Sequence, residues 1–367
     1  MSAPIPMVDP AAEYRSLQAE IDAAVRRVLS SGRYVLGPEG EGLERELGAY
    51  VGVPHAVGCN SGTDALHLAL VAAGIAPGDE VVLPAFTFFA TAEAVSYTGA
   101  TPVFADIDAR TFNLSADALS KRLTPKTRAV IVVHLFGQCA AMDEIASLCQ
   151  AKNLVLVEDC AQAIGAEYQG RRAGSWGDFG CFSFYPTKNL AAAGDAGLIT
   201  TRSADYDKLL RMLRHHGSRQ TYLHERVGWN SRLDELQAAV LRVKLAKLEQ
   251  FNAARRRVAQ KYQAKLKDTP LQLPLEDARG KHVYHQYTIR SERRDTLREA
   301  LAQGGIASSV FYPMPLHRQP AYEQFHRALA LPASEAAARS VLSLPINPLL
   351  DDPAVERICA RLREALR

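Results

Sequence analysis

The run Val155-Leu156-Val157-Glu158-Asp159 decides the fold class of this chain. Its first three residues and the preceding Leu154 form a continuous apolar run, which is typical of a strand that is buried on both faces of a parallel sheet. Residues 129–135 have the same character, and shorter apolar runs at 55–59, 80–83 and 101–106 alternate with helical stretches. This alternation predicts a layered α/β domain with a mainly parallel central sheet.

The last third of the chain follows a different pattern. Apolar residues recur at a three-to-four spacing over 233–251, which predicts one long connecting helix. The basic run Arg255-Arg256-Arg257 beyond it is typical of a solvated helix face. Strand-like, helical and again strand-like patterns then follow at 283–290, 296–303 and 306–312, as in a compact α+β unit.

The length and composition of the chain limit the number of domains and the classes of partner that it can have. A chain of 367 residues with 47% hydrophobic content is too long for one comfortable core. We expect a large α/β domain over residues 1–250, which includes the N-terminal segment, and a small C-terminal α+β domain over residues 251–367. The 43 basic and 40 acidic side chains are well interspersed, so neither nucleic acid nor a membrane surface is an expected partner.

The cysteines and the N-terminus bear on the cellular compartment. The six cysteines show no Cys-x-x-Cys spacing and lie in apolar or strand-like surroundings, which is typical of reduced, buried thiols. Residues 1–10 have no basic start followed by an apolar core, and no apolar run approaches membrane-spanning length. We expect a soluble, cytoplasmic protein.

A possible phosphate cradle lies at Cys59-Asn60-Ser61-Gly62-Thr63-Asp64, where a strand passes into a helix. The free amides and the dipole at a helix start favour an anion, and Gly62 lets the backbone come close to it. Alone, the motif favours a simpler interpretation, in which Ser61 or Thr63 only caps the helix. The cradle becomes convincing in combination with other groups.

Asp159 and Lys188 are the other candidate reactive groups. Asp159 ends a buried strand, where open α/β sheets bind ligands, and an ionised carboxylate there needs a cation or loop amides as partners. Glu158 is the weaker candidate because neighbouring side chains of a strand face opposite ways. Lys188 is embedded among small and apolar residues, which favours a desolvated amine with a lowered pKa, although a snorkelling surface lysine stays possible.

An anion cradle, a buried acid and a buried lysine together are what pyridoxal phosphate (PLP) chemistry requires. The sequence lacks the motifs of rival chemistries. The chain contains neither a P-loop nor correctly spaced dinucleotide-binding glycines, and its serine at position 61 stands one place late for a Gly-x-Ser-x-Gly elbow. The pairs His215-His216 and His282-His285 lack the spacing and acidic partner of a zinc hydrolase, so no metal site is expected.

The chain resembles the StrS/DegT-type sugar aminotransferases, which are PLP-dependent transferases of fold type I. The resemblance runs nearly end to end. Besides the cradle, it covers Ser30 to Pro38, Glu158 to Gln162, Ser183 to Lys188 and Gly228 to Gln237.

The resemblance implies a role for each matching residue. Lys188 would be the Schiff-base lysine and Asp159 the partner of the pyridine nitrogen. The cofactor would further be held by Gly62, Thr63, Phe88, Gln162, Ser183 and, from the neighbouring subunit of a homodimer, Asn230. From the sequence pattern alone, Phe88 is equally an ordinary core aromatic. Candidates for the sugar-nucleotide pocket are Tyr34, Tyr185, Thr187, Arg232, Tyr312 and His317.

The resemblance also implies the reaction. L-Glutamate would leave its amino group on the cofactor as pyridoxamine phosphate, which would then aminate a nucleotide-linked keto sugar for amino sugar biosynthesis. The segment from Ser231 to Gln237 is similar to members that act at carbon 3, and a dTDP-linked 3-keto-6-deoxyhexose is the first expectation. Members that use a UDP-linked 3-keto uronic acid carry basic residues where Ser30 and Phe311 stand here, and a basic group suits a carboxylated sugar.

Other functions remain open beside these. A uronic acid or a 4-keto sugar is the alternative substrate. A dehydratase of the same lineage would carry histidine at position 188, where this chain has lysine. A non-catalytic PLP-binding regulator or sensor is the alternative from a different functional class.

Overall fold

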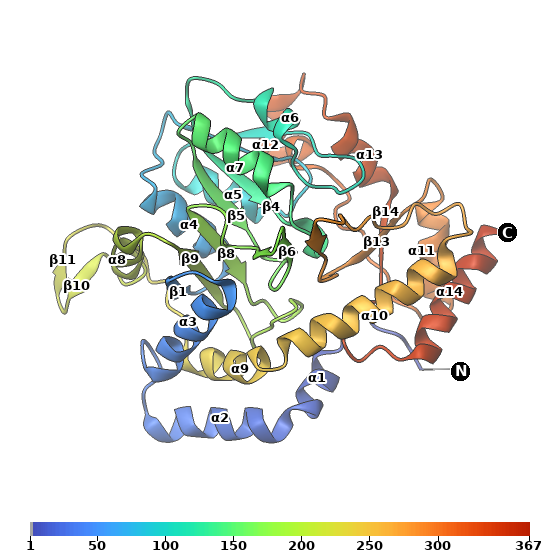
Figure 1. Ribbon diagram of the computed structural model, residues 1–367, viewed down its shortest axis with the longest axis horizontal. Helices are drawn as coiled ribbons and strands as arrows, with labels where there is room; N and C mark the ends of the chain where they lie inside the picture. The colour runs from blue at the N-terminus through green and yellow to red at the C-terminus, as the bar shows by residue number, and fades with distance from the viewer. Residues whose placement is uncertain (1–2) are drawn as a thin grey trace.

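The computed structural model of the protein describes residues 3–367 (Figure 1). Its centre is a seven-stranded sheet with the order β1-β9-β8-β5-β4-β2-β3. The strands are β1 (His55–Cys59), β2 (Glu80–Pro84), β3 (Thr101–Ala105), β4 (Thr127–Val133), β5 (Val155–Asp159), β8 (Phe179–Ser183) and β9 (Gly197–Thr201). Strand β9 runs antiparallel to β1 and β8, and the other neighbouring pairs are parallel. The predicted α/β class and mainly parallel sheet are confirmed.

Helices cover both faces of this sheet. Successive residues of β4 enter different cores, since Ala129 and Ile131 face one layer whereas Val130 and Val132 face the other. One layer contains α4 (Gly62–Ala72), α5 (Ala90–Tyr97) and α8 (Ala204–Leu213), and the other contains α3 (Pro38–Val51), α7 (Met142–Ala151) and α9 (Glu235–Leu245). Burial on both sides is the physical reason for the unbroken apolar runs in the sequence.

The C-terminal part forms its own core, at the right of Figure 1. It packs the antiparallel pair β13 (Tyr287–Arg290) and β14 (Val341–Leu344) against α10 (Leu248–Leu266), α11 (Arg294–Gln303) and α14 (Asp352–Leu366). The α+β character predicted for this part is confirmed. Ile5 also joins this core and pairs with Ile306, so the start of the described chain packs with its end.

The remaining elements are short or lie at the periphery. They are α1 (Pro10–Ser16), α2 (Gln18–Ser31), α6 (Ala116–Ser120), η1 (Leu135–Gly137), β6 (Glu167–Tyr168), β7 (Arg171–Arg172), β10 (Ser218–Gln220), β11 (Leu223–His224), β12 (Gly280–Lys281), η2 (Leu316–Arg318), α12 (Pro320–His326) and α13 (Pro332–Ser340). Within residues 3–367, no helix is both long and apolar enough to cross a membrane.

Several predicted elements differ in the structure. The single helix predicted over 233–251 is two helices, α9 and α10, which are separated by a turn at Ala246 and Lys247. Both helices bury apolar residues. The three-to-four spacing of these residues therefore continues across the turn, and the sequence pattern does not reveal it. Strand β13 occupies only the last four residues of the predicted 283–290, and the predicted strand at 306–312 makes only isolated bridges at Ile306 and Ser309.

The basic run at 255–257 lies in the middle of α10, and the predicted solvated face is wrong for two of its three residues. Arg255 is buried, with 3% of its surface exposed, and its Nη1 donates a hydrogen bond to the carbonyl oxygen of Ile346. Arg256 is half-buried and bonds to the carbonyl oxygen of His282, so only Arg257 lies on a solvated face. The segment at 346–349 folds back over the helix, which periodicity within the helix cannot reveal.

The predicted domain boundary at residue 250 falls inside α10. The start of this helix packs in the core of the large sheet through Leu248, and its later turns pack in the C-terminal core from Val258 onward. We propose that the two domains share α10 as their connection and that the division lies within it.

Candidate active site

A cavity of about 450 Å³ lies beside the carboxyl ends of the central strands. It is lined by residues that end or follow parallel strands, namely Val133 after β4, Asp159 at the end of β5 and Thr87 beyond β2. Ser61, which follows β1, and Ser183, which ends β8, complete this rim. Open α/β sheets place ligands at this edge.

The start of α4 forms one end of the cavity. Ser61 caps the helix by accepting a hydrogen bond from the backbone N–H of Asp64 at 3.1 Å. A Cβ atom on Gly62 would lie 2.6 Å from the Cβ of Ser183, so only glycine allows the helix to come this close to β8. The capping and cradle interpretations are therefore compatible, because the remaining first-turn amides, with the hydroxyls of Thr63 and Ser183, line the cavity and suit a phosphate.

Asp159 is buried, with 6% of its surface exposed. Its Oδ2 accepts a hydrogen bond from the hydroxyl of Thr91 at 2.9 Å, and its Oδ1 accepts one from the N–H of Ala161 at 3.2 Å. Burial raises the pKa of the Asp159 carboxyl, and these hydrogen bonds and the charge of Lys188 oppose the rise. A cationic ring nitrogen beside this carboxylate would favour its ionised form.

The Lys188 amine lines the same cavity. Burial lowers the pKa of this amine to about 8, and the charge of Asp159 opposes the shift. Near neutral pH, an amine with such a pKa has a far larger unprotonated fraction than a surface lysine has, and this fraction can act as a nucleophile or base.

Aromatic and amide side chains form the wall of the cavity. Phe88 is 59% exposed although it is a large apolar residue, and its ring centre lies 6.1 Å from that of Tyr312. Gln162 accepts a hydrogen bond from the N–H of Phe136 at 2.7 Å and donates one to the Tyr312 hydroxyl at 3.1 Å. An exposed ring and a fixed amide beside Asp159 and Lys188 fit a flat, polar cofactor such as PLP. Tyr185 and Thr187 also line the cavity.

Four predicted site residues lie outside the cavity of their own chain. Tyr34 and Asn230 are exposed, and Arg232 is half-buried beside the His215 ring. Asn230 lies in the segment that precedes α9, which begins only at Glu235. His317 was predicted for the substrate pocket, but it is fully buried and its Nε2 bonds to Glu335 at 3.0 Å. It does not line the cavity of its own chain.

The structure adds cavity and support residues that sequence reasoning missed. They are Thr91, Asp195, His285 and Gln286. No motif in the sequence marks these residues, because tertiary packing brings each of them to the site. His285 had been considered only as a zinc ligand together with His282.

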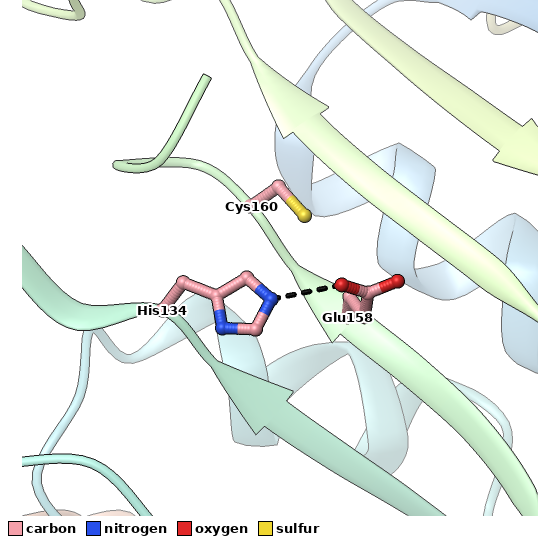
Figure 2. A group of neighbouring side chains, drawn as sticks. All are labelled: His134, Glu158 and Cys160. Atoms are coloured by element: carbon pink, nitrogen blue, oxygen red, sulfur yellow. Dashed lines mark hydrogen bonds and ion pairs between the residues drawn. The ribbon is translucent and has the colours of Figure 1, made fainter. Parts of the chain in front are cut away.

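Glu158 faces away from Asp159, as the alternation of a strand predicts. Its carboxylate accepts hydrogen bonds from the backbone N–H groups of residues 174, 176 and 177 at 2.7 to 2.9 Å and pairs with His134 Nε2 at 2.9 Å. Figure 2 shows His134 and Glu158 joined in this way, with the Cys160 sulfur nearby.

These three side chains lie close enough to hold a metal ion, but their bonding argues against one. His134 Nδ1 accepts a hydrogen bond from the N–H of Ala140, so Nε2 carries the proton that it donates to Glu158. Neither ring nitrogen then offers a free lone pair. Burial also raises the pKa of the Cys160 thiol well above its usual value, which disfavours the thiolate that metals bind.

We predict that this cluster is a structural element without metal. Glu158→Gln should destabilise the fold by roughly 3–5 kcal/mol, because an amide group would face N–H donors inside the core. Chemical denaturation of both proteins measures the difference. Dialysis against EDTA and addition of Zn²⁺ should leave the wild-type melting temperature unchanged, and a rise with Zn²⁺ that Glu158→Gln removes would contradict this interpretation.

The chain is similar to known proteins over nearly its whole length. The model of the DegT/DnrJ/EryC1/StrS aminotransferase family matches residues 15–363. The chain is 48% identical to UDP-N-acetyl-3-dehydro-alpha-D-glucosamine 3-aminotransferase from Acidithiobacillus ferrooxidans, over 99% of this chain and 98% of that protein. It is also 48% identical to dTDP-3-amino-3,4,6-trideoxy-alpha-D-glucose transaminase from Streptomyces venezuelae, over 98% of this chain and 96% of that protein.

Solved structures show the same similarity. The S. venezuelae enzyme DesV in complex with a ketimine intermediate superposes with a TM-score of 0.98 at 48% identity, and all of both chains is covered. NtdA from Bacillus subtilis with its bound cofactor PMP superposes with a TM-score of 0.91 at 28% identity, over 100% of this chain and 86% of that one. The fold-type expectation from the sequence is thereby confirmed.

Proposed function

The chain belongs to the DegT/DnrJ/EryC1/StrS aminotransferase family, and from this premise we propose that it transfers the amino group of L-glutamate to carbon 3 of a nucleotide-linked keto sugar. One observation carries the proposal. A single cavity brings together the Lys188 amine, the Asp159 carboxylate and the glycine-led start of α4. These are the three groups that a PLP-dependent aminotransferase needs.

Each residue has a distinct role in the proposed reaction. When bound, the cofactor withdraws electrons from the carbon that gains or loses a proton. Lys188 would form the covalent link to it and, once released, would move the proton as base and then as acid. Asp159 would keep the pyridine nitrogen charged, and Phe88 would stack on the ring beside Gln162. The amides at Gly62 and Thr63 and the Ser183 hydroxyl would bind the phosphate.

We further propose a homodimer whose active sites are shared. Tyr34, Asn230 and Arg232 lie outside the cavity of their own chain, and the bridge between Val35 and Asp234 holds their two segments side by side. Large apolar side chains are exposed near both segments, as at Val227, which is 88% exposed. The hairpin of β10 and β11 also projects from the body, at the left of Figure 1. Such exposed apolar surface suits a subunit interface.

The nature of the sugar is proposed from the cavity and the relatives. The two enzymes at 48% identity are both named for a sugar aminated at carbon 3, one with dTDP and one with UDP. Phe311 lines the cavity, and its apolar ring gives no counter-ion to a carboxylated sugar. We propose a dTDP-linked 3-keto-6-deoxyhexose, with a UDP-linked N-acetyl 3-keto sugar as the second candidate.

The compartment is likewise a proposal. All six cysteines are buried and free. Reduced thiols are typical of the cytoplasm.

Two steps test the proposed function. Purified holoprotein mixed with L-glutamate should lose the visible absorbance of the lysine-linked cofactor and gain that of pyridoxamine phosphate. A silent spectrum would favour the regulator or sensor. The glutamate-treated protein is then offered dTDP- and UDP-linked 3-keto and 4-keto sugars, and mass spectrometry detects the aminated product. A dTDP-linked 3-keto-6-deoxyhexose should give the highest kcat/KM, and a preference for any other sugar would overturn the substrate assignment.

A further inference from the structure

His285 lies in the cavity wall beside Lys188. The segment that carries it is pressed against η1, since the N–H of Val283 donates to the carbonyl oxygen of Gly137 and the N–H of Gln286 donates to that of Phe136. A Cβ atom on Gly137 would lie 2.9 Å from the backbone nitrogen of His285, so glycine permits this close approach. His285 is buried, with 4% of its surface exposed.

The hydrogen bonds around His285 fix its tautomer. Asn189 donates through Nδ2 to the carbonyl oxygen of Val283 at 3.1 Å and to Asn252 Oδ1 at 2.8 Å. Asn252 is oriented in turn by its bond to the carbonyl oxygen of Ile164 at 3.1 Å. Two backbone carbonyls, which can only accept, therefore orient both amides. Asn189 Oδ1 then faces His285 Nδ1 at 3.2 Å, so Nδ1 carries the proton.

A neutral ring of this tautomer has its lone pair on Nε2. Burial lowers the pKa of His285 well below its usual value, and the charges of Lys188 and Arg255 add to this effect, so the ring stays neutral. The side-chain amide of Gln286 lies 3.5 Å from Nε2, which is at the upper limit of a hydrogen bond. The lone pair is therefore available to another donor in the cavity.

We infer that His285 is a further positioning residue of the proposed reaction, on which this inference rests, and that its Nε2 accepts a hydrogen bond from the Lys188 amine. The bond matters when Lys188 is not linked to the cofactor. The free amine takes a proton from the donor carbon, becomes an ammonium group, and returns the proton to the cofactor carbon. No proton passes to His285, which holds the ammonium group in place between the two events.

Asp159 is the alternative partner of the Lys188 ammonium group, and its presence explains why a residue such as His285 is useful. The charge of Asp159 attracts the Lys188 amine. Asp159 has to face the cofactor nitrogen in the proposed reaction, so a close ion pair with Lys188 would compete with that role. A second, neutral acceptor near the amine reduces this competition and adds no charge of its own.

Two substitutions test the roles of the two ring nitrogens of His285 separately. His285→Asn keeps a polar group near the place of Nδ1, so the bond to Asn189 can persist, but nothing replaces Nε2. His285→Gln places an amide oxygen near Nε2 and gives up the Nδ1 position. If His285 positions Lys188, the Asn variant should react more slowly than the Gln variant. If His285 is only structural, the Gln variant should be the slower one.

Two readouts are measured on both variants and on wild type. In the first, stopped-flow absorbance follows the reaction of the holoprotein with L-glutamate. We expect His285→Asn to react at least about ten-fold more slowly than His285→Gln at saturating glutamate, with KM for glutamate changed less than kcat. In the second, apoprotein captures PLP, and visible absorbance follows the formation of the link to Lys188. The Asn variant should again be several-fold slower than the Gln variant.

Thermal unfolding completes the experiment. The Gln variant should melt at the lower temperature, because it loses the bond to Asn189, and yet it should keep the faster chemistry. Equal rates in the two variants, or rates that follow their melting temperatures, would overturn the inference. If wild type does not react with glutamate at all, the proposed function fails, and the PLP capture rates still decide the role of His285.

Discussion

Replacing Lys188 by alanine is expected to reduce turnover by about 10⁴-fold or more, because both the covalent link and the proton-transferring group are lost. The cavity walls do not depend on this side chain, so the fold should persist and PLP should still bind non-covalently at the start of α4. Steady-state assays measure the loss. Absorbance spectra should show that the band of the lysine-linked cofactor has disappeared.

Two controls make this result specific. Lys188→Arg keeps the positive charge and most of the volume but cannot form the link, so it should be as inactive as the alanine variant. Lys208→Ala removes an amine that is 73% exposed on α8 and should behave as wild type. A Lys188→Ala protein with more than a few per cent of wild-type turnover would contradict the assignment.

Asp159→Asn is expected to lower kcat by about 10²- to 10³-fold while the cofactor remains linked to Lys188. The amide has nearly the same shape and can keep the bond from Thr91, but it has no charge to pair with a protonated ring nitrogen. The visible band should therefore survive, and the reaction with glutamate should become slow. Stopped-flow absorbance separates these two effects.

Glu158 is the matched control for Asp159, because the two residues are neighbours on β5 and face opposite sides. Glu158→Gln should lose stability, as argued above, and at a temperature where it is folded it should keep most of its reactivity toward glutamate. Asp159→Asn should show the reverse pattern. If both variants lost the same property, the division between a chemical and a structural carboxylate would be wrong.

Much of the fold could be predicted because the decisive signals are local. The strands at 55–59, 129–135 and 154–157 were recognisable because burial on both faces requires unbroken apolar runs. The turn at Lys247 and the burial of Arg255 were not recognisable, because each depends on which distant segment packs against the helix. An apolar spacing shows that a face is buried but not what covers it.

The same distinction applies to the site. The cradle at Gly62, the acid at Asp159 and the amine at Lys188 carry motifs in the sequence next to them, and the structure brings all three to one cavity. Thr91 contacts Asp159, which lies 68 residues away in the sequence. His285 contacts Asn189, which lies 96 residues away. Spacing along the chain has no information about such contacts.

Borohydride reduction of the wild-type holoprotein is the most direct test of whether Lys188 is the covalent anchor of pyridoxal phosphate. Reduction makes the link permanent, and digestion followed by mass spectrometry locates it. We predict one modified peptide, which carries the reduced cofactor on Lys188. A label on any other lysine, or an unlabelled Lys188 in protein that retained its visible absorbance until reduction, would contradict the account.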